Sequence, residues 1–221
     1  MTRPTYAFSR AGIFGKLKLT LETINDGLKH LRAADPVMEN LIDRVGSFGL
    51  KPRRDRFRML VRAIISQQIS THAARSIRRR LEKLLAPESM TAETLARFKP
   101  PQLRTAGLSG QKAAYLLDLS RKITTGQVRL GQLHRLSDDE VIEQLIQVNG
   151  IGVWTAQMFL IFSLGRLDIF PHGDLGIRAA LRNLYELDEL PDKVTSHKIA
   201  EPWRPFATIA SWYCWRSHEL K

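Results

Sequence analysis

The residue best suited to chemistry in this chain of 221 residues is an aspartate that precedes a helix. Asp174 follows Pro171 and Gly173, which favour a loop, and it comes directly before a helix expected over Leu175–Leu184. A helix N-terminus stabilises negative charge, so we expect this carboxylate to be ionised. An ionised carboxylate can stabilise positive charge that develops in a substrate, or orient or deprotonate a water. Because aspartate before a helix is also a common N-cap, Asp174 alone does not settle the function.

A short glycine-containing hairpin lies upstream of this aspartate. Ser137 and Glu140 form a capping box that predicts a helix start, and a second, apolar helix is expected from Val153 to about Leu164. Between them, two glycines allow a sharp turn and a close approach to a ligand. The amides that begin the second helix can bind an anion such as a DNA phosphate. The candidate DNA contacts here are Asn149, Gly150, Gly152 and Thr155.

The charge balance favours a polyanionic partner. The chain has 34 lysines and arginines against 22 acidic residues, a formal net charge of +12. Cys214 is the single cysteine, so an intrachain disulfide and a four-cysteine metal cluster are both excluded. The six histidines have no ligand-like spacing, and we expect no cofactor. No secretory or membrane-spanning segment is evident, so we expect an intracellular protein of the cytoplasm or nucleoid without membrane contact.

These motifs together resemble the helix-hairpin-helix, Gly/Pro-rich-loop, Asp superfamily of DNA glycosylases, and within it the bacterial 3-methyladenine DNA glycosylase II branch. The resemblance covers roughly residues 55–217 and rests on the hairpin Asn149–Gly152, on Trp154, and on Phe170–Asp174. Asn149 is a departure, because the family often has proline there, and we expect a less rigid hairpin. The single cysteine excludes the iron–sulfur branch.

The resemblance implies a monofunctional enzyme that flips out alkylated purines, chiefly 3-methyladenine and 7-methylguanine, and hydrolyses them from double-stranded DNA to leave an abasic site. Asp174 would be the catalytic residue. Members that also cleave the backbone have a lysine nucleophile where this chain has Trp154, so water would attack here. Trp154 would stack on the cationic base. The other expected pocket residues are Trp212, Tyr213 and Met158, although Trp212 and Tyr213 also fit plain core packing.

The resemblance also implies a loop that enters the DNA. Ser66–Ser70 matches a turn from which Gln68 would fill the gap left by the flipped nucleotide, and Ser70 would contact DNA and cap the next helix. An ordinary polar turn remains the alternative for Gln68. Arginines cluster on both sides of this turn, and a solvated charged face is their alternative. A monovalent cation, if relatives are a guide, would use the carbonyls of Ile146, Val148 and Ile151.

The fold class expected is all-α, with two helical lobes, a DNA-binding cleft between them and a helix-hairpin-helix motif. We expect one glycosylase domain over residues 1–221, with one lobe over about 36–135 and the other over about 136–221 plus 1–35. Residues 1–19 would form an extended arm, and the protein would be a monomer. Two other functions remain open: a non-catalytic DNA-binding module, and a glycosylase for deaminated or mismatched bases. Further helices are expected over Thr20–Ala33, Pro36–Gly46, from Arg56, over Thr71–Leu85, Thr91–Phe98, Gly110–Thr125 and Asp192–Ala200, and from Pro205.

Overall fold

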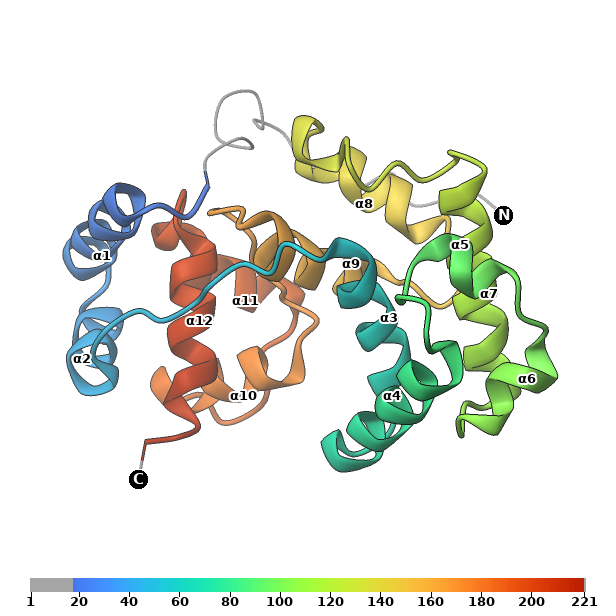
Figure 1. Ribbon diagram of the computed structural model, residues 1–221. Helices are drawn as coiled ribbons and strands as arrows, with labels where there is room; N and C mark the ends of the chain where they lie inside the picture. Colours follow the sequence, from blue (N-terminus) through green and yellow to red (C-terminus); the bar gives the residue numbers. More distant parts are fainter. Residues whose placement is uncertain (1–17, 221) are drawn as a thin grey trace, which may run out of the picture. The chain divides into compact units, whose positions relative to one another are not determined.

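The computed structural model describes residues 18–220 and confirms an all-helical chain (Figure 1). Apart from one antiparallel bridge between Lys18 and Arg166, the regular elements of these residues are helical. The expected N-terminal arm lies almost wholly outside the described residues. The α-helices are α1 (Leu21–Ala34), α2 (Pro36–Val45), α3 (Arg56–Ser66), α4 (Thr71–Leu85), α5 (Ala92–Ala96), α6 (Pro100–Thr105), α7 (Gly110–Thr124), α8 (Asp138–Ile146), α9 (Val153–Phe159), α10 (Leu175–Leu184), α11 (Lys193–Ala200) and α12 (Ala207–Ser217).

Side-chain caps explain where most of these helices begin. Ser137 and Glu140 form the expected capping box of α8, and Thr20 and Thr23 form another at α1. Each cap side chain accepts a hydrogen bond from an amide in the first turn, which has no partner within the helix. The same arrangement begins α2, α3, α4 and α7, at Asp35, Asp55, Ser70 and Ser109 respectively.

Two prolines lie at the starts of helices. Pro100 begins α6, with the Gln102 side chain accepting from the Lys99 amide, because proline fits the first turn of a helix. Pro205, expected inside the last helix, instead follows a cis peptide bond and precedes α12. The apolar helix after the hairpin also changes form, since α9 ends at Phe159 and a π-helical turn continues over Leu160–Leu164.

The helices form two compact units. Unit 1 contains residues 1–50 and 165–221, and its central element is α12, which contacts α1, α2 and α10 (Figure 1). The rings of Trp203 and Tyr213 are fully buried in its core. The buried Asp35 accepts hydrogen bonds from the Tyr185 hydroxyl at 2.5 Å and the Trp203 indole at 2.8 Å, so the polar atoms of these two rings are paired.

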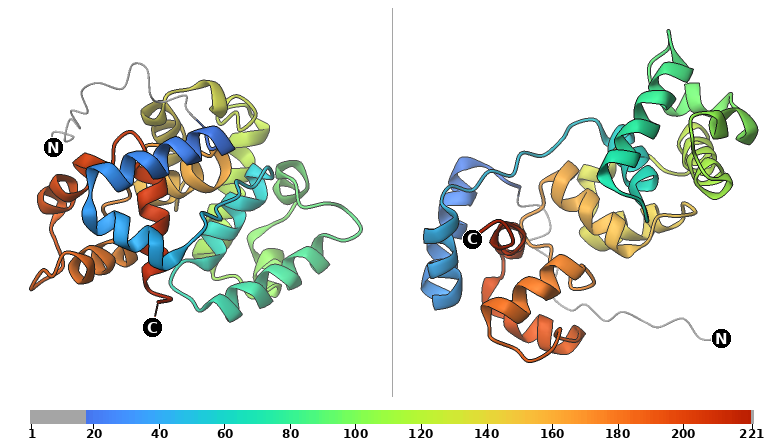
Figure 2. Two further views of the ribbon diagram at one scale, coloured as in Figure 1. Left: turned by 90° about the vertical axis from the view of Figure 1, so that its left-hand side faces the viewer. Right: turned by 90° about the horizontal axis from the view of Figure 1, so that it is seen from below.

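Unit 2 contains residues 51–164 and is built around α3 and α7. Helix α3 contacts α4, α7 and α9, while α5 and α6 cover α7 and α8 packs on α9 (Figure 2). The inward face of α3 is an apolar stripe, and its buried members are Leu60, Val61, Ile64 and Ile65.

The unit boundaries differ from those expected for the lobes. The chain divides at 50/51 and 164/165 instead of near 35/36 and 135/136. Helix α2 belongs to unit 1 because it contacts α1 and α12, and α8 and α9 belong to unit 2 because α9 contacts α3. Among the helices of the described residues, none has the length and hydropathy needed to cross a bilayer.

Candidate functional site

Asp174 is the N-cap of α10 in unit 1, as the sequence predicted. Its Oδ1 atom accepts a hydrogen bond from the Ile177 amide at 2.9 Å and a second from the Trp215 indole Nε1 at 3.0 Å. The Asp174 amide donates to the Pro171 carbonyl at 2.8 Å, which closes the loop behind it. The carboxylate is therefore held in place by an amide at a helix N-terminus and by an indole N–H.

Trp215 was not among the pocket residues expected from the sequence. It lies on α12 one turn after Trp212, and its ring also bounds the backbone of α10, since a Cβ added at Gly176 would lie 3.1 Å from the Asp174 Oδ1 and 3.4 Å from the Trp215 ring. Glycine at 176 therefore keeps space for the contact between the carboxylate and the indole. The sequence signal was the aromatic run on the last helix, but that run did not show which ring faces α10.

The loop before Asp174 is fixed by rings. Phe170 packs edge-on against Trp203 and against His197 of α11, with centroid distances of 5.7 and 5.4 Å. The His172 and His197 rings lie 3.3 Å apart between Nδ1 and Nε2. Burial is the main cause that lowers the pKa of both imidazoles, and for His172 the His197 and Lys193 charges lower it further. Lowered pKa values favour neutral rings, of which one can donate to the other.

The other unit 1 candidates fit structural roles. Tyr213 is fully buried and its hydroxyl donates to the Gly46 carbonyl at 2.8 Å, so the core-packing alternative holds for this ring. Trp212 is half-buried and packs edge-on against Phe48 at 4.8 Å. Asp168, the other acid near the loop, forms an ion pair with Arg204 at 2.8 Å, and burial is the main cause that raises its pKa.

In unit 2, the two hairpin glycines have different reasons to be glycine. Gly150 has a φ of +82°, and a Cβ added there would lie 2.1 Å from the Tyr115 ring of α7. Position 150 therefore needs glycine so that the hairpin can pack against the Tyr115 ring. This corrects the expectation that Gly150 leaves room for a phosphate. Gly152 is exposed, has an ordinary φ of −95°, and would place a Cβ in open space. Gly152 is the glycine that leaves the N-terminus of α9 open to a ligand.

A buried aspartate fixes this hairpin to α7. The Asp118 carboxylate is 5% exposed and accepts from the Asn149 amide at 2.9 Å and from Lys122 Nζ at 2.6 Å. Burial by itself would raise the pKa of Asp118, but the hydrogen bonds from Lys122, Asn149 and Arg121 outweigh it, and the pKa is lowered. Proline at position 149 would have no N–H for this bond, so asparagine supplies an anchor where a less rigid hairpin was expected.

Lys122 places an ammonium group near the carbonyls at which a cation was expected. Its ammonium donates to the Gln147 carbonyl at the end of α8, which lies between two of the three candidate oxygens, those of Ile146 and Val148. The Val148 carbonyl also accepts from the Ile151 amide at 3.0 Å. The Lys122 ammonium therefore already provides a positive charge at the C-terminal end of α8. A monovalent cation on the three candidate carbonyls stays a prediction. Residues 18–220 contain no cluster of three His, Cys, Asp or Glu residues arranged for a metal.

The Ser66–Ser70 turn is bonded to the hairpin. The Gln67 side chain donates to the Gly150 carbonyl at 2.7 Å, and Lys112 Nζ donates to the carbonyls of Ile65 and Gln67, each at 2.7 Å. Burial lowers the pKa of Lys112. Gln68 follows at a positive φ of 56°, with its side chain exposed. The Gln67 side chain and two backbone carbonyls thus hold the turn, while Gln68 is exposed.

The remaining candidates of unit 2 divide by burial. Trp154 lies in the first turn of α9 and is 46% exposed. Ser70 is exposed, and its hydroxyl caps α4. Met158 and Thr155 are buried, at 8% and 4% exposure, so Met158 belongs to the packed interior and only the Thr155 backbone remains for a DNA contact. The structure thus places Trp154, the hairpin and the Gln68 turn in unit 2, and Asp174, Trp212 and Tyr213 in unit 1.

Comparisons with known proteins agree with this geometry. DNA-3-methyladenine glycosylase 1 of Schizosaccharomyces pombe is 34% identical over 198 residues, which are 86% of this chain and 86% of that protein. The structure of 3-methyladenine DNA glycosylase Mag1 of that organism in complex with abasic DNA matches with a TM-score of 0.77 and 33% identity, over 88% of this chain and 97% of that one. A DNA-3-methyladenine glycosidase structure from Bacillus halodurans matches with a TM-score of 0.79 and 33% identity, over 86% and 88% of the two chains.

A family-level match covers the part of the chain that carries these elements. Residues 61–205 match the description "HhH-GPD superfamily base excision DNA repair protein", which is the superfamily that the hairpin and the Phe170–Asp174 loop resemble. The matched range includes the Gln68 turn, the hairpin, Trp154 and Asp174. This chain belongs to the HhH-GPD superfamily of base excision DNA repair proteins.

Proposed function

We propose that the protein is a monofunctional DNA glycosylase that excises alkylated purines, chiefly 3-methyladenine and 7-methylguanine, from double-stranded DNA and leaves an abasic site. The observation that carries the proposal is the Asp174 carboxylate, held by the Ile177 amide and the Trp215 indole at the start of α10. The names of the relatives support the substrate class. The protein acts as a monomer, and residues of both units contribute to one glycosylase domain.

The chemistry assigned to Asp174 is electrostatic. As the N-glycosidic bond breaks, its electron pair leaves with the base and positive charge develops on the deoxyribose. A carboxylate fixed before that charge develops stabilises it without reorganisation, and it can orient the attacking water or accept a proton from it. The water oxygen then forms the new bond to the sugar carbon. N3- and N7-methylated purines already carry positive charge and leave easily, so this modest machinery is sufficient.

Trp154 supports the proposed substrate and the absence of backbone cleavage. An indole cannot form the Schiff base by which a lysine nucleophile cleaves the DNA backbone, so hydrolysis ends at the abasic site. Its exposed face is available to a flipped base, and an electron-rich ring attracts a cationic purine by stacking and by cation–π contact.

The exposed elements of unit 2 support a role in DNA binding. The exposed Gln68 lies in a turn whose backbone is bonded to Lys112 and whose Gln67 side chain is bonded to the hairpin, so it is suited to fill the gap left by an extruded nucleotide. Gly152 leaves space at the start of α9, where backbone amides favour a phosphate. The exposed Ser70 hydroxyl is a further candidate contact. The net charge of +12 favours DNA association overall.

The test is incubation of the purified protein with duplexes that each carry a single lesion. The panel contains 3-methyladenine, 7-methylguanine, a deaminated base, a mismatch and an undamaged control, and abasic sites are detected by strand cleavage in hot alkali. We expect excision of the two methylated purines and no covalent trapping of the protein by borohydride. Excision of the deaminated or mismatched base alone would overturn the substrate assignment. Tight DNA binding without any excision would show a non-catalytic binding module.

A further inference from the structure

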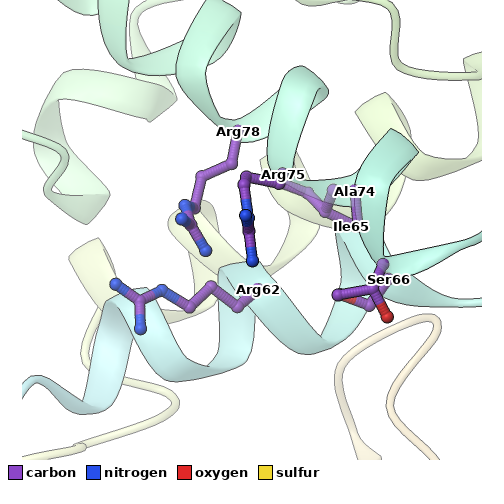
Figure 3. A pocket seen from close by; sticks show the side chains of 7 residues that line it. Arg62, Ile65, Ser66, Ala74, Arg75 and Arg78 are labelled. Atoms are coloured by element: carbon purple, nitrogen blue, oxygen red, sulfur yellow. The ribbon is translucent and has the colours of Figure 1, made fainter.

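A cationic pocket lies in unit 2 beside the Gln68 turn, and the function proposed above does not use it. The pocket has a volume of about 160 Å³ and lies between α3 and α4. Figure 3 shows that the guanidinium groups of Arg75 and Arg78 extend from α4 towards α3, where Arg62 lies. The floor is apolar, and two hydroxyl-bearing residues from the ends of the two helices complete the lining. The full lining is Arg62, Ile65, Ser66, Thr71, Ala74, Arg75 and Arg78.

The arginines of this pocket have too few counter-charges. Within residues 18–220, neither Arg62 nor Arg75 forms an ion pair with a carboxylate, and Arg78 reaches Glu82 only at 3.8 Å. The Nε atoms of Arg62 and Arg78 are buried without a hydrogen-bond acceptor. Burial, followed by the charges of Arg78 and Arg53, lowers the pKa of Arg62, and Glu82 opposes this with a smaller effect. Unpaired like charges oppose folding, so the cluster is retained at a cost in stability that a bound anion would offset.

The chemistry of the lining selects a phosphate group. Guanidinium groups bind the oxygens of a phosphate in pairs, and the Ser66 and Thr71 hydroxyls add neutral donors at the rim. A volume of about 160 Å³ is well above the roughly 10–15 Å³ that one water molecule needs, so the pocket has room for one phosphate group and some of its hydration. A purely hydrophobic ligand would leave three cations buried beneath it.

We infer that the pocket formed by Arg62, Arg75 and Arg78 binds a phosphate of the DNA backbone and serves as an anchor separate from the hairpin. Position favours DNA over free phosphate, because Ser66 and Thr71 line the pocket and also flank the turn that carries Gln68. A side chain that enters the base stack needs the neighbouring backbone held still, and a phosphate bound here would do so. This inference rests on the proposed function only in taking DNA as the partner.

The experiment compares Arg75→Gln, Arg78→Gln and the double variant with wild type. The control is Arg79→Gln, which removes the same charge as each single variant from an exposed position of α4 outside the pocket. Affinity for an undamaged duplex is measured over a series of salt concentrations. Losing one phosphate contact lowers the magnitude of the slope of log K against log salt by about 0.9. We therefore expect the double variant to bind about tenfold more weakly than wild type at low salt. When the salt concentration rises from about 50 to 200 mM, its affinity should fall by a factor about 3.5 times smaller than the factor for wild type. Arg79→Gln should keep the wild-type slope.

Two further measurements make the outcome decisive. In the absence of DNA, the double variant should unfold at a higher temperature than wild type, because it relieves the repulsion; this also shows that it is folded. A contrary result is that inorganic phosphate stabilises wild type more than chloride of equal ionic strength does, while the DNA slopes of the variants stay unchanged. That result would show a site for free phosphate and would overturn the DNA anchor. Equal slope changes in Arg75→Gln, Arg78→Gln and Arg79→Gln would reduce the pocket to part of a diffuse basic surface. The undamaged duplex reports on the pocket whether or not any base is excised, so the two proposals can fail separately.

Discussion

The hairpin of unit 2 and the Phe170–Asp174 loop of unit 1 are held in place by different interactions. At the hairpin, the buried Asp118 binds the Asn149 amide and is paired with the Lys122 ammonium. At the loop, Asp174 accepts from a helix amide and from the Trp215 indole, and the Phe170 ring packs on Trp203. One aspartate is bonded to cations and positions a backbone, whereas the other is bonded to neutral donors and presents its own carboxylate.

The difference follows from what each element is proposed to do. A phosphate contact through backbone amides depends on a fixed backbone, and a paired, buried carboxylate fixes it without taking part. A carboxylate that stabilises a developing cation has to keep its charge, and an indole N–H orients it without the full neutralising charge that a lysine or arginine brings. Asp168 fits the same rule, because it is paired with a cation, Arg204, and is not the carboxylate proposed to be catalytic.

The largest expected effect tests the hairpin half of this comparison. Asp118→Asn keeps an acceptor for the Asn149 amide but leaves the Lys122 ammonium, 14% exposed, without its counter-charge. We expect the free energy of unfolding to fall by about 3 kcal/mol, the low end for a broken buried pair, because the third partner Arg121 is exposed. Denaturant titration measures it, with the exposed Glu143→Gln of α8 as control. A loss under about 0.5 kcal/mol would show that charge does not hold the hairpin.

The next effect tests the loop half. Asp174→Asn preserves an N-cap for α10, so the fold should persist, but the charge that stabilises the transition state is lost. Single-turnover excision should fall about 100- to 1,000-fold while DNA affinity changes only a few-fold. Asp192→Asn is the matched control, because Asp192 caps α11 through the Thr195 amide at 2.8 Å in the same way. Excision by Asp174→Asn above about 1% of wild type would remove Asp174 from the mechanism.

Much of both regions could be predicted from the sequence, because the signals are local. Capping boxes and glycine turns act over three or four residues, so α8, the hairpin and the N-cap of α10 were found without tertiary information. The family resemblance, confirmed by the match over residues 61–205, then assigned Asp174 and Trp154 their positions.

The partners that hold these regions could not be predicted in the same way. Asp118 lies 31 residues before Asn149, and Trp215 lies 41 residues after Asp174, and neither separation has a period that points to contact. On α12, the face of each ring depends on how the helix packs, which is why Tyr213 was expected to line a pocket and is buried in the core. Likewise, the Tyr115 ring that excludes a side chain at Gly150 comes from another helix.

The two hairpin glycines give a third, smaller test within unit 2. Gly150→Ala should lower the free energy of unfolding by about 1–3 kcal/mol, because alanine is strained at a positive φ and its methyl group meets the Tyr115 ring. Gly152→Ala should change stability by less than about 0.5 kcal/mol, since its methyl group meets open space. It should nevertheless weaken binding to damaged and undamaged DNA alike and lower the salt slope by up to about one contact. Unchanged DNA binding by Gly152→Ala would mean that the hairpin holds no phosphate.

The smallest expected effect is a dependence of the free energy of unfolding on pH, to which the loop should contribute and the hairpin should not. Burial lowers the pKa of His172 and His197 below the ordinary value of 6.5, so the folded protein binds fewer protons at these rings than the unfolded chain does. The stability contributed by the pair is therefore complete above about pH 6.5 and is lost as pH falls from there through the folded pKa values. Asp118, whose pKa is lowered, stays ionised throughout this range, so the hairpin should not contribute.

The measurement is the free energy of unfolding between about pH 7 and pH 5 for wild type and His197→Gln. Glutamine can still hydrogen-bond His172 but cannot take up a proton, and it removes the imidazolium charge that would repel a protonated His172. The charged neighbours Lys193, Glu201 and Arg204 remain in place, so the change reports on the histidine pair itself. We expect a flatter profile for His197→Gln, and the wild-type profile for His72→Gln, an exposed position of α4. If His197→Gln loses stability with falling pH as steeply as wild type, protonation of this pair does not loosen the loop. The rings would then only pack against it, and the loop would depend on pH no more than the hairpin does.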